Sequence, residues 1–369
     1  MGNMNLLILF GKCFLYVSKQ KVNFLVFFIV KKEGFKKVPV LFWKQLIIQN
    51  WTRILNVKTG WINDFDKLIV KYMKYFQLVK NLQRHKDTIN SVKFSSDDLM
   101  IVSSSDDNTI RIWDLLSGEQ IQKFKKHLSW VNAAIFSSNG NTVVSCSKDK
   151  TIRLWDIQSR KTLMKFEGHT GSVWDVNFSK NGKYIVTGSS DRTIRLWDIN
   201  SGKEIQKLEG HLDYVNSVQF SPDGQLIVSA SNDETVAMWN VKTGERLKVL
   251  KGHSNSVTCA RFSPSGKFIV SSSGDKTIRI WDVEFGKEVK VLEGHLSWVK
   301  DVKYFPDGQT IVSGSYDGTI RLWDVKSGNL IQKLEGRAFW VTGVDISSNG
   351  NTIVSCSANK IIQIWECIL

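Results

Sequence analysis

The last four fifths of the chain consist of short runs in which hydrophobic and polar residues alternate. In "SVWDVNFS" (172–179), "YIVTGSS" (184–190) and "TIRLWDI" (193–199), apolar residues recur at about every second position, which is the spacing of a strand with one buried face. Turn sequences such as "SKNG", "SDRT" and "SGKE" separate these runs, and "IQKLEG" follows them. The pattern predicts four short antiparallel strands in each such unit.

The unit repeats every 42 residues. Tryptophan marks the period at Trp113, Trp155, Trp197, Trp239, Trp281, Trp323 and Trp365. All six histidines keep the same spacing, whereas the seventh histidine position holds Arg337. Residues 76–369 number 294, which is seven units of 42. Repeats of this length with four strands each are typical of the blades of a β-propeller.

The seventh unit stops after its third strand. The segment "FQLVKNLQRH" (76–85) aligns position by position with "GKEIQKLEGH" (202–211), which contains the fourth strand of another unit. We therefore expect residues 76–84 to add the fourth strand to the seventh blade. A ring closed in this way has no long open sheet edge that could pair with another chain.

The repeated sequence resembles that of the WD-repeat family, as in G-protein β subunits. The resemblance rests on stretches such as "GHT…SKNG…TGSSDRTIRLWD", recurs seven times and covers residues 76–369. Asn240 and Glu366 replace the aspartate that follows the tryptophan. The resemblance implies an all-β, seven-bladed WD-repeat propeller, to which the amino-terminal part adds a short α-helical extension.

Each of the first six units holds a histidine, a serine or threonine ten residues before the tryptophan, and an aspartate six before it. A triad of this kind suggests a hydrolase, but six copies of one catalytic site in a ring are not expected, whereas a structural device must repeat with the blade. In the family the set resembles a buried hydrogen-bond chain, which satisfies polar groups that otherwise cost about 1–3 kcal/mol each. The expected members are His85, Ser103, Asp107, Trp113; His127, Ser145, Asp149, Trp155; His169, Thr187, Asp191, Trp197; His211, Ser229, Asp233, Trp239; His253, Ser271, Asp275, Trp281; and His295, Ser313, Asp317, Trp323.

The seventh unit departs from this set. It keeps Ser355 and Trp365 but has Arg337 for the histidine and Asn359 for the aspartate. Two members have changed together, as is expected when a coupled pair is lost. Two readings of Arg337 stay open: a solvent-exposed side chain or part of a binding surface.

No catalytic or metal-binding motif occurs in the sequence. There is no phosphate-binding glycine loop ending in Lys-Ser or Lys-Thr, no G-x-S-x-G elbow and no C-x-x-C pair. No histidine lies outside the repeat to act as a base or a metal ligand. Asp175 and Asp301 are expected to be solvated. We therefore predict a protein that is not an enzyme and that has no cofactor.

The net charge of +15 is concentrated near the amino terminus. Residues 1–75 contain thirteen Lys and Arg against three acidic residues, whereas the remainder contains 37 against 32. A propeller so nearly balanced in charge is not expected to bind nucleic acid. The basic segment leaves one alternative open: a nucleic-acid or membrane-surface module that works through residues 1–38.

Large aromatic residues recur at positions that, by the family resemblance, open onto the top face of the ring. Aromatic rings with nearby cations often anchor protein interfaces. The candidate partner-binding residues are Trp130, Lys148, Trp174, Tyr214, Trp298, Lys300, Tyr316 and Trp340. The alternative is that each ring packs on its neighbouring loop.

The sequence as a whole predicts a non-catalytic scaffold that binds protein or peptide partners. We expect a monomeric propeller within a larger complex, located in the cytoplasm or the nucleus.

The amino-terminal 75 residues carry weaker signals. Trp43, Ile47, Trp51 and Ile54 share one helical face, and a second apolar stripe follows Asp64, so residues 39–75 are expected to form a helical pair. Residues 1–38 are apolar and basic, and the sequence does not decide whether they are ordered or touch a membrane surface. No uncharged apolar run reaches the ~18 residues needed to span a bilayer.

Overall fold

The computed structural model describes residues 5–10, 13–20, 23–30, 75–336 and 339–368. The chain divides into two units, residues 1–69 and 70–369. Residues 39–74 of the expected helical pair lie outside the described residues, and residue 75 begins a strand. Within the described residues, no helix is long and apolar enough to cross a bilayer.

The first unit contains a three-stranded antiparallel sheet. Its strands β1 (Asn5–Phe10), β2 (Cys13–Gln20) and β3 (Asn23–Val30) pair in the order β1-β2-β3. Each strand is rich in aromatic or branched aliphatic residues, as in "NFLVFFIV", which favour extended backbone. This sheet was not predicted from the sequence.

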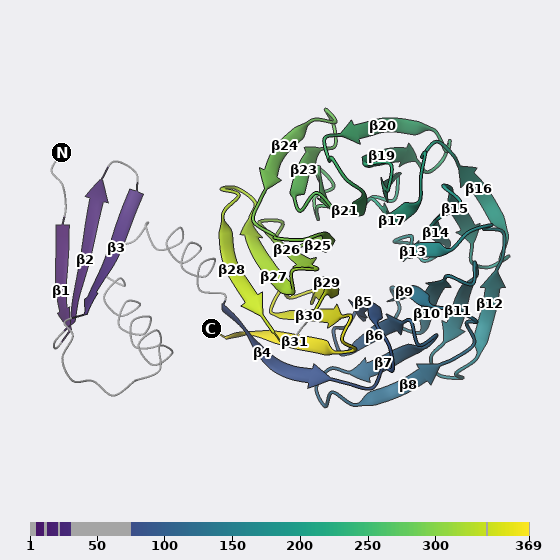
Figure 1. Cartoon of the computed structure of the whole chain (residues 1–369), viewed down its shortest axis with the longest axis horizontal. Coiled ribbons are helices and arrows are strands. Elements are labelled where there is room, and N and C mark those ends of the chain that lie inside the picture. The colour runs from purple at the N-terminus through teal and green to yellow at the C-terminus, as the bar shows by residue number, and fades with distance from the viewer. Residues whose placement is uncertain (1–4, 11–12, 21–22, 31–74, 337–338, 369) are drawn as a thin grey trace. The chain divides into compact units, whose positions relative to one another are not determined.

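The second unit is a ring of seven four-stranded antiparallel sheets (Figure 1). The prediction of an all-β, seven-bladed propeller is confirmed. The strands of blades one to three are β5 (Ile89–Phe94), β6 (Met100–Ser105), β7 (Ile110–Asp114), β8 (Gln120–Phe124); β9 (Val131–Phe136), β10 (Thr142–Ser147), β11 (Ile152–Asp156), β12 (Thr162–Phe166); and β13 (Val173–Phe178), β14 (Tyr184–Ser189), β15 (Ile194–Asp198), β16 (Glu204–Leu208). Those of blades four to six are β17 (Val215–Phe220), β18 (Leu226–Ser231), β19 (Thr235–Asn240), β20 (Arg246–Lys251); β21 (Val257–Phe262), β22 (Phe268–Ser273), β23 (Ile278–Asp282), β24 (Glu288–Leu292); and β25 (Val299–Tyr304), β26 (Thr310–Ser315), β27 (Thr319–Asp324), β28 (Leu330–Glu335).

Blade seven takes its strands from both ends of the propeller sequence. β29 (Val341–Ile346), β30 (Thr352–Ser357) and β31 (Ile362–Ile368) come from the carboxyl-terminal repeat, and β4 (Tyr75–Leu82) pairs with β31 as the outer strand (Figure 1). The register places Leu82 opposite Ile362 and Phe76 opposite Cys367. The ring is therefore closed by hydrogen bonds between segments far apart in sequence.

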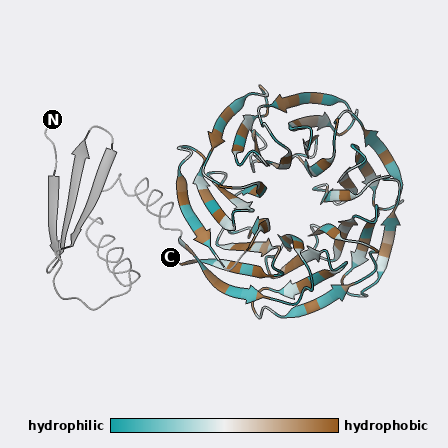
Figure 2. Cartoon of the chain, in the orientation of Figure 1, coloured by the Kyte–Doolittle hydropathy of each residue, from teal (hydrophilic) through white to brown (hydrophobic). Residues whose placement is uncertain are grey.

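The hydrophobic core lies between neighbouring blades. Each of seven buried clusters joins residues of two adjacent blades; for example, Val144 and Ile152 of blade two pack with Val173 and Trp197 of blade three. The outer strands alternate apolar and polar residues along their length, visible as brown and teal bands in Figure 2, because only one of their faces is covered.

The junction between blades six and seven has an aromatic contact of its own. In the other blades the residue after the inner strand is a serine that caps the following turn, as Ser95 does for Met100; in blade six it is Phe305. Phe305 is buried and lies edge-on against Phe76 of β4, with 6.0 Å between ring centroids. Gln332 of β28 also exchanges two hydrogen bonds with the Phe76 backbone, at 3.0 and 2.9 Å. The closing strand is thus fastened to blade six as well as to blade seven.

Candidate functional site

The predicted network residues form a continuous hydrogen-bond chain in blades one to six. In blade one the Trp113 indole N–H donates to Ser103 Oγ at 2.9 Å, the Ser103 hydroxyl lies 2.7 Å from His85 Nε2, and His85 Nδ1 lies 2.8 Å from Asp107 Oδ2. A neutral histidine with its proton on Nδ1 satisfies every donor and acceptor in this order. The His–Asp distance is 2.7–2.8 Å in all six blades.

In each of these six blades, the aspartate of the hydrogen-bond network also holds two loops in place. Asp149 accepts from the backbone N–H of Leu128 at 2.9 Å and from that of Thr151 at 3.0 Å. These residues belong to the loop before the inner strand and to the tight turn between the second and third strands. We call the face of the ring that carries these loops and turns the top face. The network therefore holds in place the segments that carry the predicted binding residues.

The titration of the network follows from its burial and its hydrogen bonds. Burial lowers the pKa of His85, His127, His169 and His295, and the paired carboxylates only partly offset this. For the six aspartates, burial alone would raise the pKa. Hydrogen bonds from the histidine, the threonine and the backbone outweigh it and hold the pKa of each carboxyl well below its usual range. In the blades of these four histidines, the neutral histidine and the ionised aspartate are the favoured pair.

Blade seven retains one part of this chain. The Trp365 indole donates to Ser355 Oγ at 3.0 Å. Asn359, in the aspartate position, accepts a hydrogen bond from the Ser357 hydroxyl. Arg337 lies outside the described residues, so the two readings of that residue remain predictions.

A cavity of about 400 Å³ opens at the top face around the ring axis. Of the eight candidate partner-binding residues, five line it: Trp130, Trp174, Lys300, Tyr316 and Trp340. Lys148, Tyr214 and Trp298 do not line it. The volume is within the range of pockets that hold small ligands.

Four aromatic side chains form a continuous row beside this cavity, across blades six and seven. Trp298 and Tyr316 are parallel within 8° at 6.5 Å, Tyr316 and Trp340 lie 5.2 Å apart, and Trp340 and Phe339 lie 5.1 Å apart. Trp298 also contacts Gly274 of blade five, where an added Cβ would lie 2.9 Å from its ring. Trp298, Trp340 and Phe339 are 41%, 47% and 61% exposed. The rings pack on their neighbours and remain accessible.

Two of the other three predicted aromatic residues on this face, Trp130 and Tyr214, occupy equivalent positions outside the row. In blade two the Lys148 ammonium lies 3.9 Å from the centre of the Trp130 ring, a cation–π contact. In blade four Tyr214 is exposed and its carbonyl accepts from the Asn232 N–H at 2.9 Å. This backbone bond recurs between Trp130 and Lys148 at the same distance, so the two positions are equivalent places on different blades.

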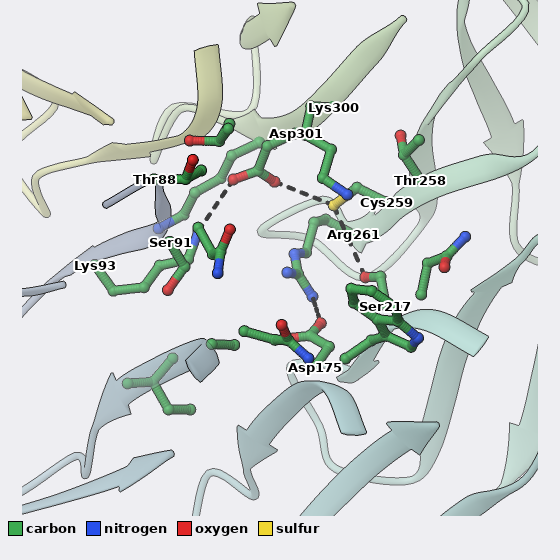
Figure 3. A pocket seen from close by; sticks show the side chains of 18 of the residues that line it. Thr88, Ser91, Lys93, Asp175, Ser217, Thr258, Cys259, Arg261, Lys300 and Asp301 are labelled. Atoms are coloured by element: carbon green, nitrogen blue, oxygen red, sulfur yellow. Dashed lines mark hydrogen bonds and ion pairs between the residues drawn. The ribbon is translucent and has the colours of Figure 1, made fainter. Parts of the chain in front are cut away.

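Within the lining of the cavity, ion pairs connect blades that are not neighbours in the ring (Figure 3). Lys93 of blade one lies 3.3 Å from Asp301 of blade six, and Arg261 of blade five lies 3.1 Å from Asp175 of blade three. The expectation that Asp175 and Asp301 are solvated is wrong, since they are 7% and 9% exposed. The inner strands turn these side chains toward the axis, where cations from other blades neutralise them.

The Lys93–Asp301 pair keeps its charges despite burial. Burial disfavours the ionised form of Lys93, but Asp301 and Asp345 outweigh it and raise its pKa above the ordinary value. Burial likewise works against the Asp301 carboxylate, but Lys93 and Arg261 lower its pKa. The Cys259 thiol, 3.2 Å from Asp301, has a pKa raised to about 11 by burial, so it is a poor nucleophile. Among the described residues no cluster of His, Cys, Asp and Glu could hold a metal ion.

Comparison with protein families agrees with this architecture. The model of the WD domain, G-beta repeat, matches residues 76–114, 244–282, 286–324 and 328–366, and the model of the fourth β-propeller of WDR90 matches residues 130–261. The chain belongs to the WD-repeat family. WD-repeat propellers generally act as protein-interaction scaffolds and are typically non-catalytic. A search of curated proteins finds no match to this chain.

The second residue of the inner strand bonds the next blade in most blades, but not in all. Five blades place there an asparagine or threonine that bonds a carbonyl of the next blade; these are Asn90, Asn132, Asn216, Thr258 and Thr342, at 2.5–3.0 Å. Blade three has Trp174 and blade six has Lys300. Both line the cavity.

Sequence reasoning missed two features of this site. Phe339 extends the aromatic row, and its position directly before Trp340 was the signal that could have revealed it. The cations Lys93, Arg261 and Lys303 were also missed. These three cations occupy the same position of the 42-residue repeat, and Asp175 and Asp301 occupy the position two residues before it. Both positions face the ring axis, so their opposite charges could have indicated ion pairs.

Proposed function

We propose that this WD-repeat propeller is a non-catalytic scaffold that binds a protein or peptide partner on its top face, over blades six and seven. The single observation that carries the proposal is the exposed aromatic row from Trp298 to Phe339. Aromatic side chains bury a large area on binding and lose few rotatable bonds, so they are effective interface anchors. The row borders a cavity with polar groups, which gives a partner both apolar contact and orientation.

The aromatic row is lopsided around the ring. On the neighbouring blade five the corresponding positions hold Ser256 and Gly274, which offer little apolar surface. A partner is therefore expected to cover one sector of the top face, not to sit symmetrically over the axis. The network of His295 and Asp317 holds the blade-six loops that carry Trp298 and Tyr316, so the binding surface is formed before the partner arrives.

Capture of partners from a cell extract by the immobilised full chain tests the proposal. Trp298→Ala with Trp340→Ala should abolish capture of the proteins that the unchanged chain retains, as read by mass spectrometry. Phe285→Ala is the matched control. Phe285 is 67% exposed, but it lies in the turn after β23, whereas Gly274, which contacts Trp298, lies in the turn before that strand. Equal loss in the control variant, or capture that persists in the double variant, would disprove the proposed surface.

The basic amino-terminal segment gives the competing outcome. If binding is salt-sensitive and is lost when residues 1–38 are deleted, it depends on charge and not on the row. Capture that tolerates salt and depends on the two tryptophans supports the scaffold.

A further inference from the structure

We infer that the top-face cavity binds an acidic side chain of an extended peptide: its carboxylate pairs with Lys300, and apolar side chains of the same segment lie along the aromatic row. The inference rests on the proposed function and specifies the chemistry of the partner. It follows from the position of Lys300, from the charges around it and from the parts of the aromatic rings that are exposed.

Lys300 occupies a position that the fold uses for a different purpose in most blades. Five blades place there a side chain that bonds the next blade, whereas the described residues show no such bond from Lys300 to blade seven. Blade six has thus exchanged an inter-blade hydrogen bond for an ammonium group that extends into the cavity (Figure 3). Positions that break a local rule without a structural gain are expected at functional sites.

The other cations of the cavity are already neutralised. Lys93 pairs with Asp301, Arg261 with Asp175, and Lys303 with Asp345. Lys300 has no carboxylate partner among the described residues. The remaining acidic group in the lining is Asp106 of blade one, whose carboxylate accepts from Asn90 at 2.7 Å. Lys300 is therefore the cation of the lining that can pair with the carboxylate of a ligand.

The aromatic row shares the rim of the cavity with Lys300. Tyr316 is paired with Trp298 and with Trp340, Trp340 is also paired with Phe339, and Trp298 contacts Gly274. Trp298, Trp340 and Phe339 are exposed, so they offer apolar surface to a partner. The ammonium group of Lys300 gives this rim a positive charge that favours an acidic side chain, and the rings favour the apolar neighbours of that side chain.

The charge of Lys300 disfavours a methylated or free ammonium ligand, because the two like charges would repel each other. Single-stranded nucleic acid can stack its bases on aromatic rings, so the experiment includes it as a competitor. An extended peptide offers a carboxylate and apolar side chains in one segment.

Selection from a random peptide display library on the immobilised full chain tests this inference. Enriched peptides should carry aspartate or glutamate next to proline or aliphatic residues. For one enriched peptide, Lys300→Gln should weaken binding about tenfold, and so should changing the peptide's acidic residue to its amide. The two changes together should weaken it no further than about twofold beyond either alone, because they remove the same interaction.

Two control variants separate this pair from general electrostatics. Lys276→Gln removes an exposed top-face cation that does not line the cavity and should leave affinity within about twofold. Asp106→Asn removes the remaining carboxylate of the lining and should leave affinity equal or make it tighter. Equal melting temperatures show that all variants fold.

The outcomes distinguish the two proposals. Peptides that require Trp298 and Trp340 but show no acidic residue, or that ignore Lys300→Gln, overturn the acidic-ligand inference and leave the scaffold standing. If no peptide is enriched, or the enriched peptides ignore both tryptophans, the proposed surface fails as well. Displacement of the peptide by single-stranded poly-uridine RNA, with RNA binding lost in the tryptophan variant, would show that bases occupy the row and would overturn the inference.

Discussion

Two sets of positions recur every 42 residues in the propeller, and the blades treat them differently. The His–Ser/Thr–Asp–Trp chain has the same chemistry in blades one to six. The position that holds Trp298 in blade six holds Thr88, Trp130, Ser172, Tyr214, Ser256 and Trp340 in the others. The first set bonds within its own blade and meets the same neighbours in each copy. The second set faces solvent or the ring axis, where no repeated neighbour constrains it, so it can specialise.

Acidification should give the largest effect, because it acts on the repeated set in six blades at once. The lowered pKa of His85, His127, His169 and His295 means that the unfolded chain binds their protons more readily, so this stability is present above the unfolded pKa of ~6.5 and is lost as pH falls below it. The lowered pKa of the six aspartates adds a second loss below about pH 4.

Urea denaturation at pH 7.5, 6.5, 5.5 and 4 measures this dependence. The free energy of unfolding should fall at each step. His127→Gln should be less stable at pH 7.5 and should show a shallower decline to pH 5.5, because one titrating group is gone. A free energy of unfolding that is constant from pH 7.5 to 5.5 would contradict the proposed neutral state of the histidines.

The second prediction concerns an exception to this comparison. The aromatic contact between Phe76 and Phe305 is not repeated in the other blades, yet it stabilises the fold. Phe76→Ala should destabilise the propeller by about 3–5 kcal/mol, the usual cost of truncating a buried phenylalanine. Phe305→Ala should have an effect of the same kind. Because the rings touch, the double variant should lose less than the sum. Denaturant unfolding of the four proteins measures the coupling, with Phe285→Ala as the exposed control, and strictly additive losses would show that the two rings do not act together.

The sequence was sufficient to predict the repeated part of this molecule. The 42-residue period, the strand pattern and the WD-repeat resemblance predicted the blades, and the spacing of His85, Ser103, Asp107 and Trp113 led to a network that the structure joins by hydrogen bonds. Such predictions succeed because these contacts are local to one blade and every copy repeats the same evidence.

The contacts between blades could not be predicted in the same way. Lys93 and Asp301 are separated by 208 residues, and their pairing depends on how the closed ring brings blades one and six to the axis. The period says which residues hold equivalent positions, but it does not say which side chains reach across blade seven to each other. The stacking of Trp298, Tyr316 and Trp340 has the same origin, since it depends on side-chain directions on two blades.

The third prediction uses the blade that lacks the repeated pair. Blade seven carries Arg337 and Asn359 in place of histidine and aspartate, so it should open before the others. Hydrogen exchange should be fastest in the strands of residues 341–367 and 77–83, with a deficit on the order of 1–3 kcal/mol. Arg337→His with Asn359→Asp should slow exchange there more than either change alone, because a lone His or Asp would lack its partner. Uniform exchange across seven blades, unaffected by the double variant, would mean that this position has another role.

The smallest effect on stability is expected at the top-face aromatics. Trp298→Ala with Trp340→Ala removes two partly exposed rings, so it should change the melting temperature by only a few degrees, which for a protein of this size corresponds to about 1 kcal/mol. Trp323→Ala in the same blade is the contrasting control: that indole is buried and donates to Ser313 at 2.9 Å, so its loss should cost about 3–5 kcal/mol. Thermal unfolding of the three proteins checks the contrast. A large drop in the double variant would show that the row is part of the core, and the assignment of Trp298 and Trp340 to a binding surface would fail with it.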